Sequence, residues 1–585
     1  MRMINGRSPL SILLFGAFAL GATTQAQKPS QPKSGEPNDD VVRVKTELVQ
    51  TDVTVIDKRG RVVEGLAPEQ FQLRVDAKPQ TLVFFEQVAT GAATEEKQLA
   101  AARNGKTAIS PDSSSTGQME DRGRLIFFFV DDIHLASDSL VRARSLLTRF
   151  VEQYMTAGDR VAIISASGQI GFLQQLTDNK VVLREAITRI NSKYNPETIA
   201  SHVSISEVDA TLVANHREGG LFAYLVEATM KEYQTDVVNA VNIVKNRVRQ
   251  INAQSSRVEI ETLSRLESLI RSTAPLAGRK LVFLISDGFV VDAKRSNGSD
   301  VMRRVAQQAA RVGSVIYSLD TRSNFLGAGV DTSKNDYPDF SGRTAGRSVA
   351  EDTMPQAPLE TLADETGGRS YLNSNTLDDG LSQALAENST YYLLVWKPGS
   401  DKQRSGKSRI DVAIKDRPDL RVRVRRHLFD PTLPAPAKAI AASKVTPEDE
   451  LKSALGSLYP RRDVPTSLVA VVDIMRKGAV LNLSMQIDSG NLTFDRANGR
   501  EVAIVDVLGA AIDDRGICST FRQKLEVPRE AVAADPLVKW KQSLPLPPGL
   551  YQVRVAVRDR QSGRTGSAMT WVEVSPLKLL PAEKH

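Results

Sequence analysis

The hydrophobic positions between residues 124 and 389 predict strands and helices that alternate along the chain. Residues 125–130 form a continuous apolar run, as expected of a strand that is buried on both faces. Apolar residues then recur at helical spacing from residue 137 to residue 154. Further strands are predicted at 161–164, 170–173, 281–285 and 315–319, and further helices at 179–190, 301–312, 359–366 and 377–386. This order predicts a doubly wound, mostly parallel α/β sheet over residues 124–389.

Two long insertions interrupt the predicted sheet. Residues 192–278 carry helical spacing over most of their length, which predicts either two packed helices or one long projecting helix. Residues 321–356 are rich in Gly, Ser and Asp and are expected to form a surface loop. The α/β domain is therefore expected to carry a helical insertion at 192–278 and a separate long loop.

Segments with alternating apolar and polar residues flank this region. Residues 42–89 and 390–428 both alternate, as half-buried strands do. Because neither segment holds enough strands to be stable alone, we expect them to pair into one β-sandwich with the α/β domain inserted between them. Regular short strands at 466–576 predict a C-terminal β-sandwich. The remaining segments are expected to be a flexible leader at 27–41, a linker at 90–123, and a linker with one short helix at 429–465.

Residues 1–26 have the three parts of a secretory signal peptide. Arg2 and Arg7 supply positive charge, residues 10–22 form an uncharged apolar run, and Ala26 ends the segment with a small side chain. The run is shorter than the roughly 20 apolar residues that a spanning helix needs, so cleavage is favoured over a membrane anchor. We expect an exported protein, periplasmic or extracellular, with no transmembrane helix after signal cleavage.

Composition and charge narrow the class of protein. The chain has 585 residues, of which 41% are hydrophobic and 25% charged; these values are typical of soluble, multidomain globular proteins. Loss of Arg2 and Arg7 with the signal lowers the formal net charge from +7 by two, to +5, which does not favour nucleic acid as a partner. Cys518 is the only cysteine, so no internal disulfide forms, and we expect it to be a small buried residue.

Four segments, taken in order, resemble a von Willebrand factor A domain. They are Leu125-Ile-Phe-Phe-Phe-Val-Asp-Asp132, Gly158-Asp-Arg-Val-Ala-Ile-Ile164, Gly278-Arg-Lys-Leu-Val-Phe-Leu-Ile-Ser-Asp-Gly288 and Leu359-x-x-Leu-Ala-x-x-Thr-Gly-Gly-Arg-Ser-Tyr371. With its flanking β segments, the region of about residues 40–430 resembles the bacterial von Willebrand factor A-related family that is common in acidobacteria. The resemblance implies a six-stranded, parallel-type sheet between helices.

The resemblance also implies candidate metal ligands. Many domains of this family hold a divalent cation through Asp-x-Ser-x-Ser after the first strand, a Thr in a later loop, and an Asp after the fourth strand. Asp131 or Asp132 fits the first position, and Asp287 fits the last. Mg²⁺ requires six oxygen ligands, and Mg²⁺ or Ca²⁺ is the cation that these carboxylates would take.

This chain departs from the family pattern at both serine positions. Ile133 and Leu135 replace the serines if Asp131 is the first ligand, and His134 and Ala136 replace them if Asp132 is. Either register loses two hydroxyl ligands, so we expect a degenerate site. The Thr position cannot be assigned, because the hydroxyl residues of the insertion, Ser204, Ser206 and Thr211, have no clear signature.

Other candidate sites favour binding over catalysis. His134 lies beside Asp132, but no His-x-x-x-His or Gly-x-Ser-x-Gly arrangement occurs. Arg421, Arg423 and Arg425 share one strand face; we expect a solvated face, with an anionic envelope surface as the alternative partner.

We therefore expect a binding or scaffold protein, not an enzyme, that recognises an unidentified protein partner. Its alternatives are an envelope hydrolase that acts on glycan or peptide, and a structural spacer that binds nothing. A pocket that holds a nucleophile beside a base would favour the hydrolase.

Export makes a testable prediction about the mature N-terminus. Mass spectrometry of the protein from its native host should give a first residue at Gln27 or within a few residues of it, because Ala26 ends the predicted cleavage motif. Recovery of a cytoplasmic form that still begins at Met1 would contradict the prediction.

Overall fold

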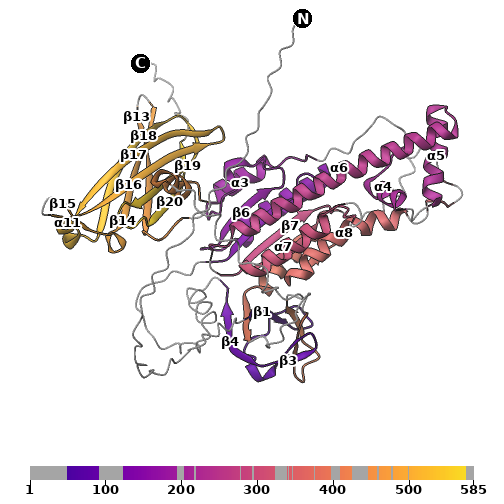
Figure 1. Cartoon of the computed structure of the whole chain (residues 1–585), viewed down its shortest axis with the longest axis horizontal. Helices are drawn as coiled ribbons and strands as arrows, with labels where there is room; N and C mark the ends of the chain where they lie inside the picture. Colours follow the sequence, from indigo (N-terminus) through magenta and orange to yellow (C-terminus); the bar gives the residue numbers. More distant parts are fainter. Residues whose placement is uncertain are drawn as a thin grey trace, which may run out of the picture. The chain divides into compact units, whose positions relative to one another are not determined.

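A computed structural model gives the fold of most of the chain (Figure 1). It describes residues 49–90, 123–193, 203–215, 219–276, 278–292, 296–322, 339, 342–344, 347–373, 376–396, 409–424, 446–457, 460–475, 478–497 and 500–574. The predicted signal peptide (1–26) and leader (27–41), and nearly all of the linker at 90–123, lie outside the described residues.

The central body is built on a five-stranded parallel sheet in the order β6-β5-β7-β8-β9. Its strands are β5 (Leu125–Val130), β6 (Arg160–Ser165), β7 (Lys280–Ser286), β8 (Ser314–Asp320) and β9 (Ser370–Tyr371). The predicted mixed α/β class with a parallel sheet is confirmed. The family resemblance implied six strands, and the described residues form five.

Alternate side chains of β5 point to opposite faces of the sheet, so both faces are packed. Phe128 lies in one hydrophobic core and Phe127 in the other, and neither is more than 1% exposed. The Phe128 core is covered by α2 (Ser137–Arg149), α3 (Lys180–Arg189) and α9 (Leu377–Glu387). The Phe127 core is covered by α6 (Val237–Ser272), α7 (Gly298–Val312) and α8 (Arg347–Thr366). This burial explains why β5 has no polar residue.

Two local predictions within this body were wrong. Residues 170–173, predicted as a strand, contain a single 3-10 turn at Gly171–Leu173. The loop predicted at 321–356 ends early, because α8 begins at Arg347 and continues through Pro355 and Pro358. Proline has no N–H and normally interrupts a helix, so the sequence placed the start of α8 twelve residues too late.

The insertion forms a helical lobe, which we define as α4 (Glu207–Ala214), α5 (Gly219–Tyr233) and the first two-thirds of α6. The 36-residue α6 projects beyond the sheet, with α4 and α5 near its far end (Figure 1). The lobe has its own hydrophobic core, which includes Leu225 from α5, Val244 from α6 and Met354 from α8. One long projecting helix is therefore present, together with shorter helices packed on it.

The strands that flank the α/β region hydrogen-bond to one another in two antiparallel sheets. One sheet has the order β12-β1-β10-β4 and the other β11-β2-β3. Val53 pairs with Tyr392, and Leu73 pairs with Val412, so each sheet contains strands from both sides of the α/β region. The strands are β1 (Val49–Ile56), β2 (Phe71–Val75), β3 (Lys78–Gln80), β4 (Leu82–Ala89), β10 (Thr390–Trp396), β11 (Ile410–Ile414) and β12 (Arg421–Val424).

The C-terminal region is β-rich and contains three strands that the pattern did not predict. It comprises α10 (Pro447–Leu455), β13 (Thr466–Met475), β14 (Gly478–Asp488), β15 (Asp495–Ala497), β16 (Arg500–Asp513), β17 (Gly516–Pro528), α11 (Arg529–Ala534), β18 (Leu537–Leu546), β19 (Gly549–Asp559) and β20 (Thr565–Val574). The additional strands β15, β17 and β18 are rich in exposed polar residues. Cys518 is exposed on β17, so its predicted burial was wrong; β17 pairs only with β16 in its sheet, which leaves the strand open to solvent.

Among the described residues, no helix is both long enough and apolar enough to cross a membrane.

Candidate functional site

The three candidate aspartates lie at the carboxyl edge of the parallel sheet. Asp131 and Asp132 directly follow β5, and Asp287 directly follows β7. Ligand sites of doubly wound sheets form at this edge, and the three aspartates lie there as the sequence predicted. The described contacts nevertheless give each of the three carboxylates its own set of donors.

Asp131 is fully buried and bonded to three different parts of the fold. The Nδ1 of His134 lies 2.9 and 2.8 Å from its two oxygens. The hydroxyl of Ser286, at the end of β7, donates at 2.7 Å, and that of Thr262 on α6 donates at 3.4 Å. Because a carboxylate only accepts hydrogen bonds, His134 carries its proton on Nδ1. The bonds fix the loop after β5 against β7 and against the insertion.

Asp132 points to a different group of donors. Its Oδ1 accepts from the Ser167 backbone N–H at 2.8 Å, and its Oδ2 accepts from the Ser167 hydroxyl and from the Gln169 side-chain amide. Both partners lie in the turn after β6. Asp132 therefore links the ends of two neighbouring strands.

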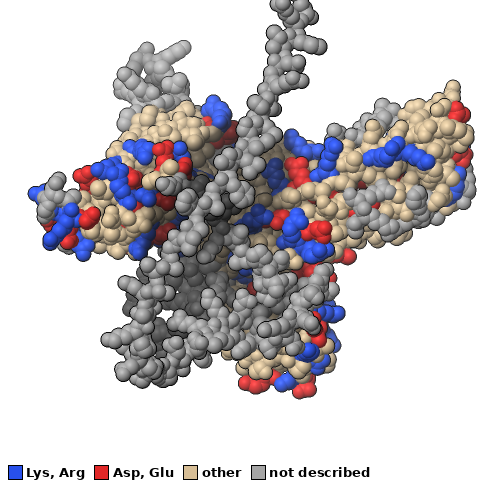
Figure 2. All heavy atoms as spheres, in the orientation of Figure 1, with Lys and Arg blue, Asp and Glu red and all other residues tan. Residues whose placement is uncertain are grey.

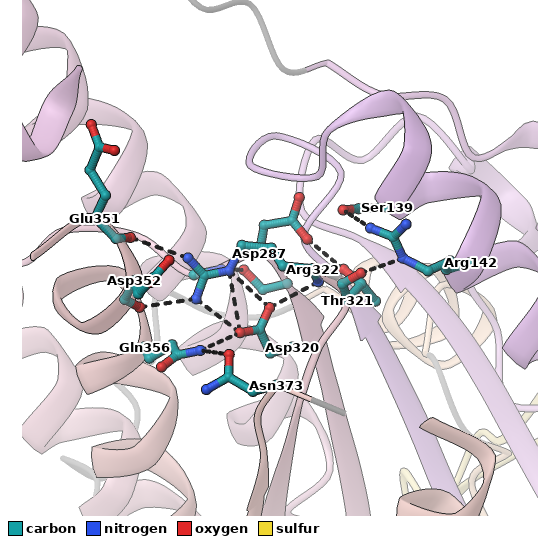
Figure 3. A network of polar contacts seen from close by, with 12 residues as sticks. Ser139, Arg142, Asp287, Asp320, Thr321, Arg322, Glu351, Asp352, Gln356 and Asn373 are labelled. Carbon is teal, nitrogen blue, oxygen red and sulfur yellow. Dashed lines mark hydrogen bonds and ion pairs between the residues drawn. The ribbon is translucent and has the colours of Figure 1, made fainter. Parts of the chain in front are cut away.

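Asp287 is bonded to the start of α2 and to the end of β8. The backbone N–H of Ala136 donates to its Oδ2 at 2.9 Å, and the Thr321 hydroxyl donates to its Oδ1 at 2.6 Å. Arg142 of α2 donates to the Thr321 carbonyl at 2.6 Å and to the Ser139 hydroxyl at 2.9 Å. Figure 3 shows these side chains converging from α2, β7 and β8.

A second ion pair at the same edge holds α8. Arg322 contacts Asp320 at 2.9 Å and donates to the carbonyls of Glu351 and Asp352, each at 3.3 Å (Figure 3). The Glu351 carbonyl is the one that the missing N–H of Pro355 would have satisfied in an uninterrupted helix. Arg322 thus compensates one of the lost bonds, which explains how α8 continues through a proline.

Burial shifts the pKa values of the titratable groups at the edge. Burial lowers the pKa of His134, but the charge of Asp131 and the hydrogen bond to it outweigh burial, so the net shift is upward. Burial raises the pKa of Asp132 and of Asp287 against their hydrogen bonds, mainly from Ser167 and from Thr321 respectively. The contact with Asp131 therefore favours the protonated form of His134.

The arrangement does not fit a magnesium centre. Mg²⁺ requires near-octahedral oxygen ligands, but the oxygens of Asp131, Asp132 and Asp287 already accept protein hydrogen bonds. The Nδ1 of His134 lies within hydrogen-bond distance of both oxygens of Asp131. Within the described residues, no group of three or more His, Cys, Asp or Glu side chains could hold a metal ion. We assign no cation to the site.

Several residues at this edge were missed by sequence reasoning, and two candidates lie elsewhere. Thr262 was missed because it lies far from the other site residues in sequence, in the middle of α6. Ser206 caps α4 and Thr211 donates to Asn252 at 3.3 Å, so these hydroxyls stabilise the lobe.

Arg423, expected on a solvated face, donates to the Gly368 carbonyl at 3.0 Å, and its side chain is only 19% exposed. The prediction that Arg421, Arg423 and Arg425 share a solvated face was therefore wrong for Arg423. Arg425 lies outside the described residues.

In the described contacts, no hydroxyl at this edge donates to His134. Ser286 and His134 both bond to the carboxylate of Asp131, whereas the serine of a Ser–His pair donates to the imidazole itself. The hydroxyls of Ser167 and Thr321 likewise donate to carboxylates, those of Asp132 and Asp287.

Glu259 on α6 is a second buried carboxyl near His134. It is 1% exposed and accepts from the Ser296 hydroxyl at 3.1 Å. It lies so close to Gly298 that a Cβ there would be 1.4 Å from its Oε1. Burial raises the pKa of Glu259 to about 7, against the hydrogen bond from Ser296 and the charge of His134.

No model of a known protein family matches the chain, and a search of curated proteins finds no match either.

We predict weak or absent Mg²⁺ binding. Calorimetry of the folded protein should give no dissociation constant tighter than about 10 μM. The site lacks two hydroxyl ligands and its carboxylates already accept protein hydrogen bonds, whereas Mg²⁺ requires a nearly complete octahedral set of oxygen ligands. The matched variant is Asp287→Asn, which keeps the side-chain shape. Tight binding that is lost in this variant would contradict the prediction.

We also predict that Glu259 makes stability fall as pH rises. Its carboxyl has a higher pKa in the folded state, about 7, than the ordinary 4.5, so the folded state binds the proton more tightly and loses stability between these two values. Glu259→Gln should remove a loss on the order of 2 kcal/mol between pH 4.5 and 7, measured by urea unfolding.

The control for this measurement is Glu261→Gln, since Glu261 is half exposed on the same helix. An unchanged pH dependence in Glu259→Gln, or an equal change in Glu261→Gln, would overturn the assignment.

Proposed function

We propose that this chain is an exported, von Willebrand factor A-type binding or scaffold protein that acts without a metal ion. The main support is the helical lobe. It adds a hydrophobic core of its own, separate from the two that cover the sheet. Packing within such an insertion must offset the entropy lost when the insertion becomes ordered. The lobe then adds outer surface to the α/β body, to which α6 joins it.

The carboxyl edge supports binding without a cation. Protein donors bond to the oxygens of Asp131, Asp132 and Asp287. On this proposal no cation is held there, so an acidic side chain of a partner has no open coordination position to fill. We therefore propose that the lobe, and not the edge of the sheet, recognises the partner. The lobe shares α6 with the sheet core.

Two other functions are supported less well. An envelope hydrolase requires an activated nucleophile, and the Ser286 hydroxyl is engaged by Asp131. A spacer that binds nothing leaves the lobe without a role, although it remains an outcome of the experiment below.

The test compares two variants of the mature protein in affinity capture from detergent-solubilised envelope extract, with and without chelator. Lys245→Glu with Arg249→Glu changes the exposed surface of the lobe, and Asp131→Asn with Asp287→Asn changes the edge. We expect capture that resists chelator and falls at least about tenfold in the lobe variant only, since charge reversal places like charges against the partner.

The control is Lys539→Glu with Lys541→Glu, which makes the same charge change on exposed positions of β18. Loss of capture with chelator, or in the edge variant alone while both variants fold, would replace this proposal with a metal-dependent site. The absence of any captured protein would favour the spacer.

A further inference from the structure

The α6 helix has two opposite faces in the lobe. Ala240, Val244 and Val248 are buried in the lobe core. At 3.6 residues per turn, the opposite face carries an exposed series, which we call the outer stripe: Val238, Asn242, Lys245, Arg249, Ala253 and Arg257. The cations of this stripe extend along about 18 Å of helix, at 1.5 Å per residue.

The outer stripe is positively charged, and its cations Lys245 and Arg249 have no acidic neighbour within four residues on α6. Residues 237–258 contain no Asp or Glu. The remaining part of α6 differs, because Glu261 and Glu267 pair there with Arg265 and Arg271 at 3.6 and 2.8 Å. Lys245 and Arg249 therefore lack the acidic i,i+4 partners that Arg265 and Arg271 have, whereas Arg257 lies four residues from Glu261.

Acidic side chains elsewhere in the lobe are engaged by other groups. Asp209 pairs with Arg347 at 2.7 Å, Glu227 pairs with Lys231 at 2.8 Å, and Asp236 caps α6. Figure 2 shows Lys and Arg gathered over the middle of the projecting lobe, with acidic groups at its far end. A negatively charged surface is thus attracted to the side of the helix and not to its tip.

Exposed apolar residues accompany these charges. Val238, on the stripe itself, is 66% exposed, and its neighbours Val237 and Tyr233 are 52% and 44% exposed. Exposed cations on one helix face are attracted to anionic lipid headgroups, and an exposed apolar side chain beside them adds burial in the interface.

We propose that the outer stripe of α6 docks the protein on an anionic lipid bilayer, with the helix axis along the membrane plane. Lys245, Arg249 and Arg257 contact lipid headgroups, and Val238 enters the interface. This inference rests on the proposed binding role of the lobe and names the surface that it binds.

The test is flotation of the full mature chain with vesicles of phosphatidylcholine alone or with about 30% phosphatidylglycerol. The wild type should partition onto the anionic vesicles and be released by about 0.5 M salt, which screens surface charge. Lys245→Gln with Arg249→Gln and Arg257→Gln should weaken partition about 100-fold, since each cation near the surface contributes roughly fivefold. Val238→Ser should weaken it by a smaller factor of about three.

The control is Arg522→Gln with Lys539→Gln and Lys541→Gln, which removes the same charge from exposed positions of β17 and β18. Thermal melts establish that both triple variants fold. Equal partition onto neutral vesicles, or an equal loss in the control, overturns the proposal. Poly-glutamate binding that depends on the stripe, without vesicle binding, assigns the stripe to an acidic polypeptide instead. If the wild type does not bind the anionic vesicles but is still captured from detergent extract in the presence of chelator, the lipid-docking proposal is wrong and the proposed function is retained.

Discussion

The buried carboxylate of Asp131 is the constraint on which the arrangement of the sheet edge depends. It has no exposure, so its charge must be satisfied by protein groups, and an uncompensated buried charge would cost about 3–5 kcal/mol. Its donors are His134 from the same loop, Ser286 from β7 and Thr262 from α6. One carboxylate therefore links the ends of β5 and β7 to the long helix α6, which leads to the lobe.

The helix α8 connects the same edge to the lobe. Its N-terminal part joins the lobe through the ion pair of Arg347 with Asp209 at 2.7 Å, and its C-terminal part packs under the sheet through Leu359. Between them, the Pro355 carbonyl accepts the Phe289 N–H at 3.2 Å. Gly288, with φ +85°, allows this approach, since a Cβ there would lie 2.3 Å from the Pro355 oxygen. Gly288 thus allows α8 to approach the sheet edge, and α8 contacts both the edge and the lobe.

Local pattern predicted the sheet better than it predicted the site. The apolar run at 125–130 identified β5 because both of its faces are buried, whereas the polar strand β17 faces solvent and left no apolar signal. The start of α8 was missed because Arg322, a partner that is distant in sequence, satisfies the Glu351 carbonyl that Pro355 leaves without its helical donor. The aspartates were placed correctly at the sheet edge, but their donors come from β6, β7, β8 and α6, and no spacing rule links those residues. The resemblance to von Willebrand factor A domains suggested a cation at Asp131, and the structure places the Nδ1 of His134 against both oxygens of that carboxylate.

We infer that His134, bonded to both oxygens of Asp131 through Nδ1, stands where a metal ion would bind this carboxylate. Crystals grown with about 10 mM Mn²⁺ and measured at the manganese absorption edge provide the test, because anomalous scattering locates the ion without reference to activity. We expect His134 Nδ1 within hydrogen-bond distance of Asp131 and no anomalous peak at the carboxylates of Asp131 and Asp287. A peak coordinated by these carboxylates, with His134 displaced, would overturn the inference.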